Sequence, residues 1–226
     1  MDARRVTDPV AGAKVSVNYV RQERGCPSHA TGWRRLKLVF TPWPISYKGV
    51  MQRAILAFVD DVYENWELWY PKLRLKEAGT ATRLARPALS TFNGKHGYPA
   101  TADLLIADAQ SADFCGLLIP GGFMPDKLRR DRKVLALTRE FFAAGKLVAF
   151  ICHGGWIPIS AKILSSRRTT GSLGIKDDLQ NAGALWVDRP VVVEGNLISS
   201  RTPRDLPAFA RAMVEFLKTN EEGRKA

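Results

Sequence analysis

Three short runs of consecutive apolar residues place the strongest limits on how this chain folds. They are Ala54–Val59, Gly116–Ile119 and Leu147–Ile151. A strand that is apolar on both faces must be covered on both sides, which is typical of a parallel sheet between two helical layers. Helical patterns at 66–78 and 132–144 separate these runs, and a glycine follows each of them. The alternation therefore predicts an α/β fold.

The rest of the chain from residue 54 onward continues this alternation. A further short strand is predicted at 82–85, and residues 91–103 form a turn-rich excursion. We also predict helices at 156–164, 176–182 and 206–218, and a hairpin that joins Val191–Val193 to Leu197–Ser200. Together these elements predict a flavodoxin-like three-layer sandwich with a mainly parallel sheet. In such a sheet, ligands bind beyond the carboxyl ends of the strands.

Residues 1–50 differ from the rest of the chain. They mix Pro, Arg, Gly and Trp without a sustained helical or strand period, and the first buried-strand pattern follows Met51 almost at once. One interpretation is that Met51 is the natural start and that residues 1–50 come from an upstream or misassigned start. The alternative is a genuine disordered or surface-wrapping extension. In both cases residues 51–226 are expected to form the main domain, and the candidate functional residues are sought there.

Charge and composition exclude several classes of function. The net charge is +12, of which residues 1–50 and residues 51–226 carry +6 each, so the larger part is only mildly basic. It has no basic stripe interleaved with aromatic residues, and we expect no nucleic-acid partner. No run approaches the ~20 apolar residues of a membrane span, and we see no secretory signal, so a cytoplasmic protein is expected. Three widely spaced cysteines indicate free thiols, and we expect neither a metal nor a cofactor.

Cys152 is the candidate nucleophile. It ends an apolar strand and is followed by His153-Gly154-Gly155 and a predicted helix. This strand–turn–helix pattern is typical of a nucleophile elbow, and the helix N-terminus is expected to lower the pKa of the thiol. The alternative is that Cys152 is a small buried apolar residue, as most free cysteines are. That alternative is favoured for Cys115, which has no turn beside it.

At this point the chain resembles the PfpI family of the ThiJ/PfpI superfamily, over residues 51–218. The resemblance lies in several ordered blocks, which are Glu64-Asn65-Trp66-Glu67-Leu68, Gly94-Lys95-His96-Gly97-Tyr98, Leu118-Ile119-Pro120-Gly121-Gly122, Cys152-His153-Gly154, Gly174-Ile175-Lys176-Asp177-Asp178 and Val193-Glu194-Gly195-Asn196. So many blocks in one order make the resemblance specific.

The resemblance implies a role for individual residues. Cys152 matches the family's nucleophile, and His153 its general base. Glu64 matches the acid that hydrogen-bonds this cysteine, although an exposed charge at a helix start explains it equally well. Backbone N–H groups of Gly122 and His153 match the oxyanion hole. Asp126 matches an acid that orients the histidine from a neighbouring subunit, which implies a homo-oligomer; the alternative for Asp126 is a helix N-cap.

Two activities are attached to the family: hydrolysis of small peptides, and glutathione-independent conversion of methylglyoxal and related aldehydes, including removal of glycation adducts, in stress protection. The resemblance therefore implies a small carbonyl compound or a peptide as substrate. The alternative is a non-catalytic stress protein in which Cys152 senses oxidants. The chain departs from the family's pattern near the site, because Ser172 stands where members often carry tyrosine, and Gly155 and Trp156 follow the elbow.

Overall fold

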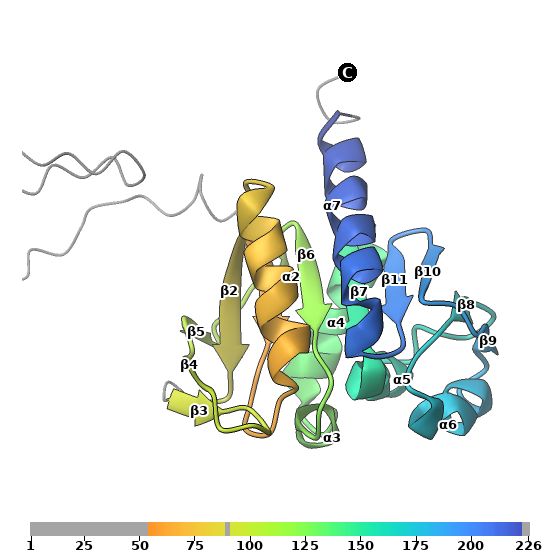
Figure 1. Ribbon diagram of the computed structural model, residues 1–226, viewed down its shortest axis with the longest axis horizontal. Helices are drawn as coiled ribbons and strands as arrows, with labels where there is room; N and C mark the ends of the chain where they lie inside the picture. The colour runs from red at the N-terminus through yellow and green to blue at the C-terminus, as the bar shows by residue number, and fades with distance from the viewer. Residues whose placement is uncertain (1–53, 89–90, 223–226) are drawn as a thin grey trace, which may run out of the picture. The chain divides into compact units, whose positions relative to one another are not determined.

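The structure, a computed structural model, describes residues 54–88 and 91–222 (Figure 1). The predicted extension at 1–50 and the proposed start at Met51 lie outside these residues. Within them, no helix combines the length and the apolar character that crossing a membrane requires.

One mainly parallel sheet organises the described residues. Its strands, in spatial order, are β10 (Val191–Glu194), β11 (Leu197–Ser200), β7 (Leu147–Ile151), β6 (Gly116–Ile119), β1 (Ala54–Phe58), β2 (Ala81–Arg86) and β5 (Leu104–Leu105). All neighbouring strands are parallel except β10 and β11, which form the predicted hairpin. The apolar runs become β1, β6 and β7 at the centre of the sheet, and every residue of these strands is buried.

Helices cover both faces of the sheet, as predicted. On one face α2 (Asn65–Glu77) packs against α7 (Leu206–Glu222), and both lie in front of the sheet in Figure 1. On the other face α4 (Arg132–Ala143) contacts β6 and β7. The flavodoxin-like three-layer prediction is therefore confirmed. The short helices α3 (Met124–Leu128), α5 (Trp156–Ser160) and α6 (Lys176–Asn181) follow strand ends and build the edge on which a ligand would bind.

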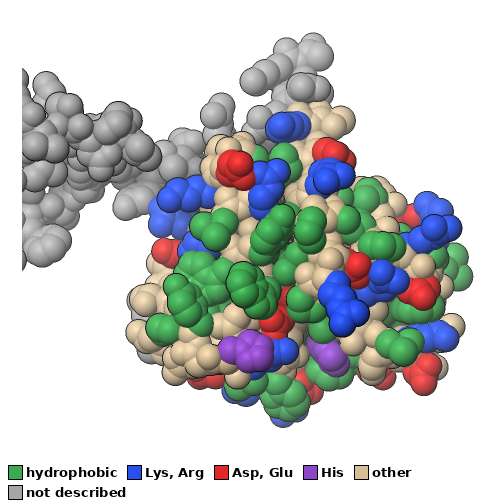
Figure 2. All heavy atoms as spheres, viewed as in Figure 1, with side chains coloured by type: hydrophobic (Ala, Val, Ile, Leu, Met, Phe, Trp, Pro, Cys, Tyr) green, Lys and Arg blue, Asp and Glu red, His purple; other side chains and the backbone are tan. Residues whose placement is uncertain are grey.

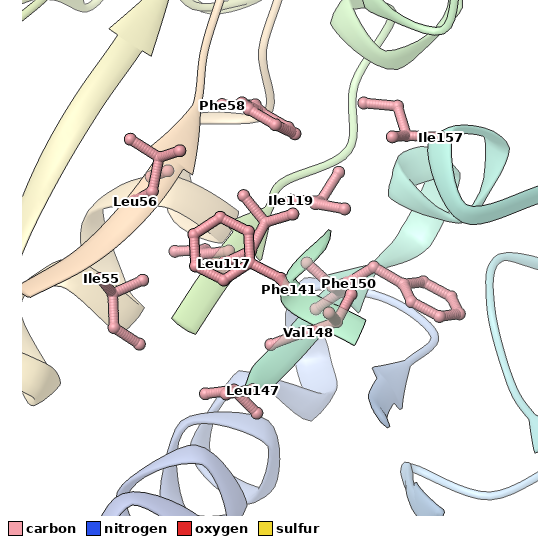
Figure 3. Close-up of a cluster of buried hydrophobic side chains, with 14 of the residues drawn as sticks. Ile55, Leu56, Phe58, Leu117, Ile119, Phe141, Leu147, Val148, Phe150 and Ile157 are labelled. Atoms are coloured by element: carbon pink, nitrogen blue, oxygen red, sulfur yellow. The ribbon is translucent and has the colours of Figure 1, made fainter. Parts of the chain in front are cut away.

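The apolar core holds the strand ends in place. Phe58, Ile119 and Phe150 come from three neighbouring strands and pack near Ile157 of α5 (Figure 3). Each of these side chains is fully buried, and such burial contributes roughly 1.5–3 kcal/mol per large apolar side chain. This packing fixes the carboxyl ends of β1, β6 and β7 relative to one another.

The structure corrects some predicted elements. The helix predicted at 156–164 is only α5, because Lys162 adopts a left-handed backbone conformation (φ 59°) that ends it. The excursion at 91–103 contains a hairpin of β3 (Thr91–Asn93) and β4 (Pro99–Thr101). A small second pair, β8 (Arg168–Thr169) and β9 (Leu185–Trp186), was not predicted. Strands of two or three residues are too short to show a period in the sequence.

Candidate active site

Cys152 lies at a strained turn between β7 and a 3-10 turn, Cys152–Gly155, that leads into α5. Its φ is 58°, a left-handed conformation that costs a non-glycine residue on the order of 1–3 kcal/mol. The backbone N–H of Ser172 donates to the Cys152 carbonyl at 3.4 Å and ties the turn to the following loop. The predicted strand–turn–helix elbow is therefore present.

His153 lies directly beside the sulfur. Its Nδ1 is 3.2 Å from Sγ of Cys152, which is hydrogen-bond distance for a thiol. Burial lowers the pKa of His153, the positive charge of Lys95 lowers it further, and Asp178 opposes both effects. The imidazole is thus neutral at pH 7. When the proton is on Nε2, Nδ1 is free to accept the proton of the thiol.

The carboxyl that meets Cys152 belongs to Glu67 of α2. Glu67 is fully buried, and its Oε2 accepts the N–H of Gly121 at 2.8 Å. A Cβ built on Gly121 would lie 2.6 Å from this oxygen and 2.9 Å from Cβ of Cys152, so only a glycine allows the approach. Burial, with a smaller contribution from the charge of Glu64, raises the pKa of Glu67 to about 8. At pH 7 this carboxyl is therefore protonated.

The thiol is less acidic than the sequence indicated. Burial and the neighbouring Glu67 raise the pKa of Cys152 to about 12, although the backbone N–H of His153 and the side chain of Ser172 favour the thiolate. The expectation that a helix N-terminus lowers this pKa is therefore wrong, because desolvation of the charged form outweighs the nearby donors. The resting site holds a thiol, a neutral imidazole and a neutral carboxyl.

Glu64, to which the resemblance assigned the acid beside the cysteine, has other partners. It is the N-cap of α2, and its Oε1 accepts the N–H of Trp66 at 3.4 Å. Its Oε2 lies 2.6 Å from Nζ of Lys95 and 3.8 Å from Nε2 of His96. Glu64 lies at the helix start, as the alternative predicts, but it is buried (3% exposed) and not an exposed charge. Glu67, one turn further along the helix, lies beside Cys152. The sequence carries no local signal that separates Glu67 from Glu64, since of the two apolar neighbours of Glu67, Leu68 is buried and Trp66 is exposed.

Gly122 lies at the turn after β6, where a non-glycine residue would not fit. Its φ is 85°, and a Cβ would lie 2.4 Å from the carbonyl oxygen of Val62. The two hydrogen bonds that join this turn to residues 62–64 use the N–H groups of Glu64 and Phe123, not that of Gly122. The backbone nitrogen of His153 lies 3.0 Å from the Cβ position of Gly121. The two loops that would supply the oxyanion hole therefore meet beside Cys152.

Asp126 lies in α3, and within the chain its carboxylate pairs with Arg130 one turn further on. The N-cap of α3 is Phe123, so the alternative explanation of Asp126 as an N-cap is wrong. The role that requires a neighbouring subunit stays a prediction. Among the described residues, no three His, Cys, Asp or Glu side chains form a group that could hold a metal ion.

Comparison with known proteins identifies relatives over this part of the chain. The model of the DJ-1/PfpI family matches residues 53–216. The protein named Deglycase PfpI, from Pyrococcus furiosus, is 43% identical over 164 residues, which are 73% of this chain and 99% of that protein. General stress protein 18 of Bacillus subtilis is 41% identical over 171 residues, 74% of this chain and 99% of that protein.

Solved structures show the same fold. A ThiJ/PfpI domain protein from Brachyspira murdochii matches with a TM-score of 0.72 and 26% identity, over 74% of this chain and 98% of its own. A two-domain protein from Anabaena variabilis, with a DJ-1/ThiJ/PfpI-like and a ferritin-like domain, matches with a TM-score of 0.72 and 34% identity. That match covers 74% of this chain and 48% of the other.

Proposed function

Because the chain belongs to the DJ-1/PfpI family, we propose that it is an enzyme in which Cys152 attacks the carbonyl carbon of a small aldehyde such as methylglyoxal. The observation that carries this proposal is the 3.2 Å contact between Sγ of Cys152 and Nδ1 of His153. Relatives named deglycases support carbonyl chemistry, and the relative named a general stress protein supports a role in stress protection.

The first step follows from the protonation states of the site. As Sγ bonds to the aldehyde carbon, the thiol proton passes to Nδ1 of neutral His153, so a stable thiolate is not needed beforehand. The C=O pair moves onto oxygen, and the N–H groups of Gly122 and His153 are the donors that would hold the developing negative charge. Protonated Glu67 is the acid nearest the new bond and would supply a proton to that oxygen.

The later steps are redox-neutral within the substrate. In the hemithioacetal of methylglyoxal, the hydrogen on the aldehyde carbon leaves as a proton and returns to the neighbouring carbon through an enediol. The aldehyde carbon is thereby oxidised to a thioester and the adjacent ketone is reduced to an alcohol. Water then cleaves the thioester, which releases lactate and restores the thiol. After the first step Glu67 is a carboxylate and His153 an imidazolium, so Glu67 takes and returns the carbon-bound proton while His153 exchanges protons with the two oxygens; hydrolysis of the thioester then returns one proton to the thiol from His153 and one to Glu67 from water.

Methylglyoxal consumption without glutathione tests this function. Purified protein is incubated with methylglyoxal, the product is identified by an enzymatic lactate assay, and a short chromogenic peptide amide is assayed in parallel. We expect formation of lactate at a rate proportional to protein concentration. Cleavage of the peptide with no loss of methylglyoxal would instead assign the site to peptide hydrolysis. If neither substrate reacts while Cys152 is still oxidised by dilute peroxide, the site is an oxidant sensor.

We expect Asp126→Asn to reduce turnover by roughly tenfold or more, because an acid from a neighbouring subunit would orient His153. The fold should be unaffected, since the ion pair that the carboxylate makes is with Arg130, a side chain that is largely exposed. Turnover and oligomer size are measured together, the latter by light scattering. Unchanged turnover would exclude Asp126 from the site.

Mixed oligomers provide the decisive control for sharing between subunits. When Asp126→Asn and Cys152→Ala chains are co-expressed with different tags, a mixed pair contains one site with both residues intact. Purified mixed oligomers should therefore regain activity that neither variant has alone. Mixed oligomers whose activity per intact Cys152 is no higher than that of the Asp126→Asn protein would show that Asp126 acts within its own subunit.

A further inference from the structure

Trp156 holds an unusual position beside the candidate base. It begins α5, three residues after His153, so the two side chains lie on one side of the same turn. Their rings meet edge to face, with centroids 5.0 Å apart and an angle of 64° between the planes. This is a favourable geometry for an aromatic pair. The imidazole therefore has the indole as a neighbour in addition to the sulfur of Cys152.

Other side chains hold Trp156 in place. Its Nε1 donates to Oδ2 of Asp178 in α6 at 2.7 Å. The guanidinium of Arg129 lies 5.9 Å from the centre of its ring and is itself fixed by a 2.8 Å hydrogen bond to Ser160. The indole is therefore held by a hydrogen bond at its edge and a cation over its ring, while it contacts His153 with another part of its surface.

We propose that Trp156, held by Asp178, is a positioning residue that keeps Nδ1 of His153 directed at the sulfur of Cys152. This inference rests on the proposed reactivity of Cys152 and adds the means by which a single subunit orients the base. An imidazole on a short 3-10 turn has few fixed neighbours, and rotation about its χ1 would separate Nδ1 from Sγ. The edge-to-face contact with the indole opposes such a rotation, because the rotation would break it.

Asp178 acts on His153 in a second way, through its charge. The groups that influence the imidazole are Cys152, the cation Lys95 and the anion Asp178, while Arg129 lies over the indole. Asp178 supports the protonated imidazole that forms when the thiol proton is transferred. Asp178→Asn would keep an oxygen for Nε1 of Trp156 and remove the charge, and Asp178→Ala would remove both.

Alkylation of Cys152 by iodoacetamide as a function of pH measures this positioning without any carbonyl substrate. We expect Trp156→Ala to slow alkylation at pH 7 by roughly tenfold or more, since the thiol loses its aligned base. Trp156→Phe keeps a ring against His153 and should retain more of the rate. Asp178→Ala should approach Trp156→Ala, Asp178→Asn should stay near wild type in rate, and the exposed neighbour Asp177→Ala, which removes the same charge from α6, should have no effect.

NMR of the imidazole signals measures the pKa of His153, which would not change if Trp156 and Asp178 had only a structural role. The chain has three histidines, and a His153→Gln spectrum identifies the signal of His153. Asp178→Asn should lower the pKa of His153, whereas Trp156→Ala should raise it toward the ordinary value by exposing the ring.

An unchanged alkylation profile in folded Trp156→Ala, or equal effects of Asp177→Ala and Asp178→Ala, would overturn the inference. If alkylation follows the expected order while methylglyoxal is not consumed, the positioning holds and only the proposed substrate fails.

Discussion

Replacing Cys152 by alanine is expected to abolish carbonyl turnover, with a loss on the order of a thousandfold or more. Sγ of Cys152 lies 3.2 Å from Nδ1 of the candidate base His153, and alanine removes the sulfur. The fold should persist, because alanine fills the same small space at the end of β7. Lactate formation from methylglyoxal and near-UV circular dichroism, measured on the same samples, test both parts of this expectation.

Cys115→Ala is the matched control. Cys115 precedes β6, and its Sγ donates to the carbonyl oxygen of Ala54 at 3.3 Å, so it is tied to the sheet rather than to the site. This variant should keep full turnover at a small cost in stability. Turnover that persists in Cys152→Ala, or disappears in Cys115→Ala, would contradict the assignment of the nucleophile.

Cys152→Gly adds a test of the strained turn. The left-handed φ of 58° suits glycine and penalises residues with a Cβ by about 1 kcal/mol or more. Cys152→Gly should therefore be inactive yet more stable than Cys152→Ala by about 1 kcal/mol in urea unfolding. Equal stability of the two variants would show that the turn relaxes when the sulfur is removed.

Replacing Glu67 by glutamine is expected to reduce carbonyl turnover by about a hundredfold, because an amide cannot deliver the proton of a carboxylic acid. The rate at which the Cys152 thiol is alkylated should instead increase at high pH. Above pH 8 the wild-type carboxyl ionises, and its charge opposes formation of the thiolate. Alkylation of Cys152 at pH 9 should therefore be roughly tenfold faster in Glu67→Gln than in wild type.

The same substitution should change how stability depends on pH. The folded-state pKa of Glu67 is raised from 4.5 to about 8, so the stability linked to its proton is fully present below pH 4.5 and is lost as pH rises toward 8. At pH 7 the unfolded chain has released this proton and the folded chain still holds it. This difference lowers the free energy of unfolding by roughly 3 kcal/mol relative to acidic pH. Glutamine carries no such proton, so Glu67→Gln should gain stability over wild type at pH 8 and little at pH 5.

Glu64→Gln is the control for this pair of effects. Glu64 caps α2 and pairs with Lys95, and it does not contact Cys152. Its replacement should weaken the helix start and leave alkylation of the thiol nearly as in wild type. If turnover falls as much in Glu64→Gln as in Glu67→Gln, the role of the acid belongs to Glu64, as the resemblance implied.

The amino-acid pattern alone was sufficient to predict the fold and the strand–turn–helix elbow at Cys152, the candidate nucleophile. Apolar runs in β1, β6 and β7 require cover on both faces, and that requirement selects a three-layer sheet whatever the details of packing. Cys152 could be identified because the end of a buried strand and the following glycines are both local features of the chain. The short strands β8 and β9 were not predicted, because each is stabilised by pairing with residues distant in the sequence.

Only the tertiary structure decided which acid meets the sulfur and which species the site contains. Glu64 and Glu67 are one turn apart on α2, and nothing local distinguishes them; the angle at which the helix packs on the sheet turns Glu67 inward to Gly121 and Cys152. The protonation states depend on the same packing. Burial raises the pKa of both the carboxyl and the thiol, because the loss of water destabilises the charged form of each group more than nearby hydrogen-bond donors stabilise it. Desolvation depends on how the layers pack together, so it cannot be predicted from the order of the residues alone.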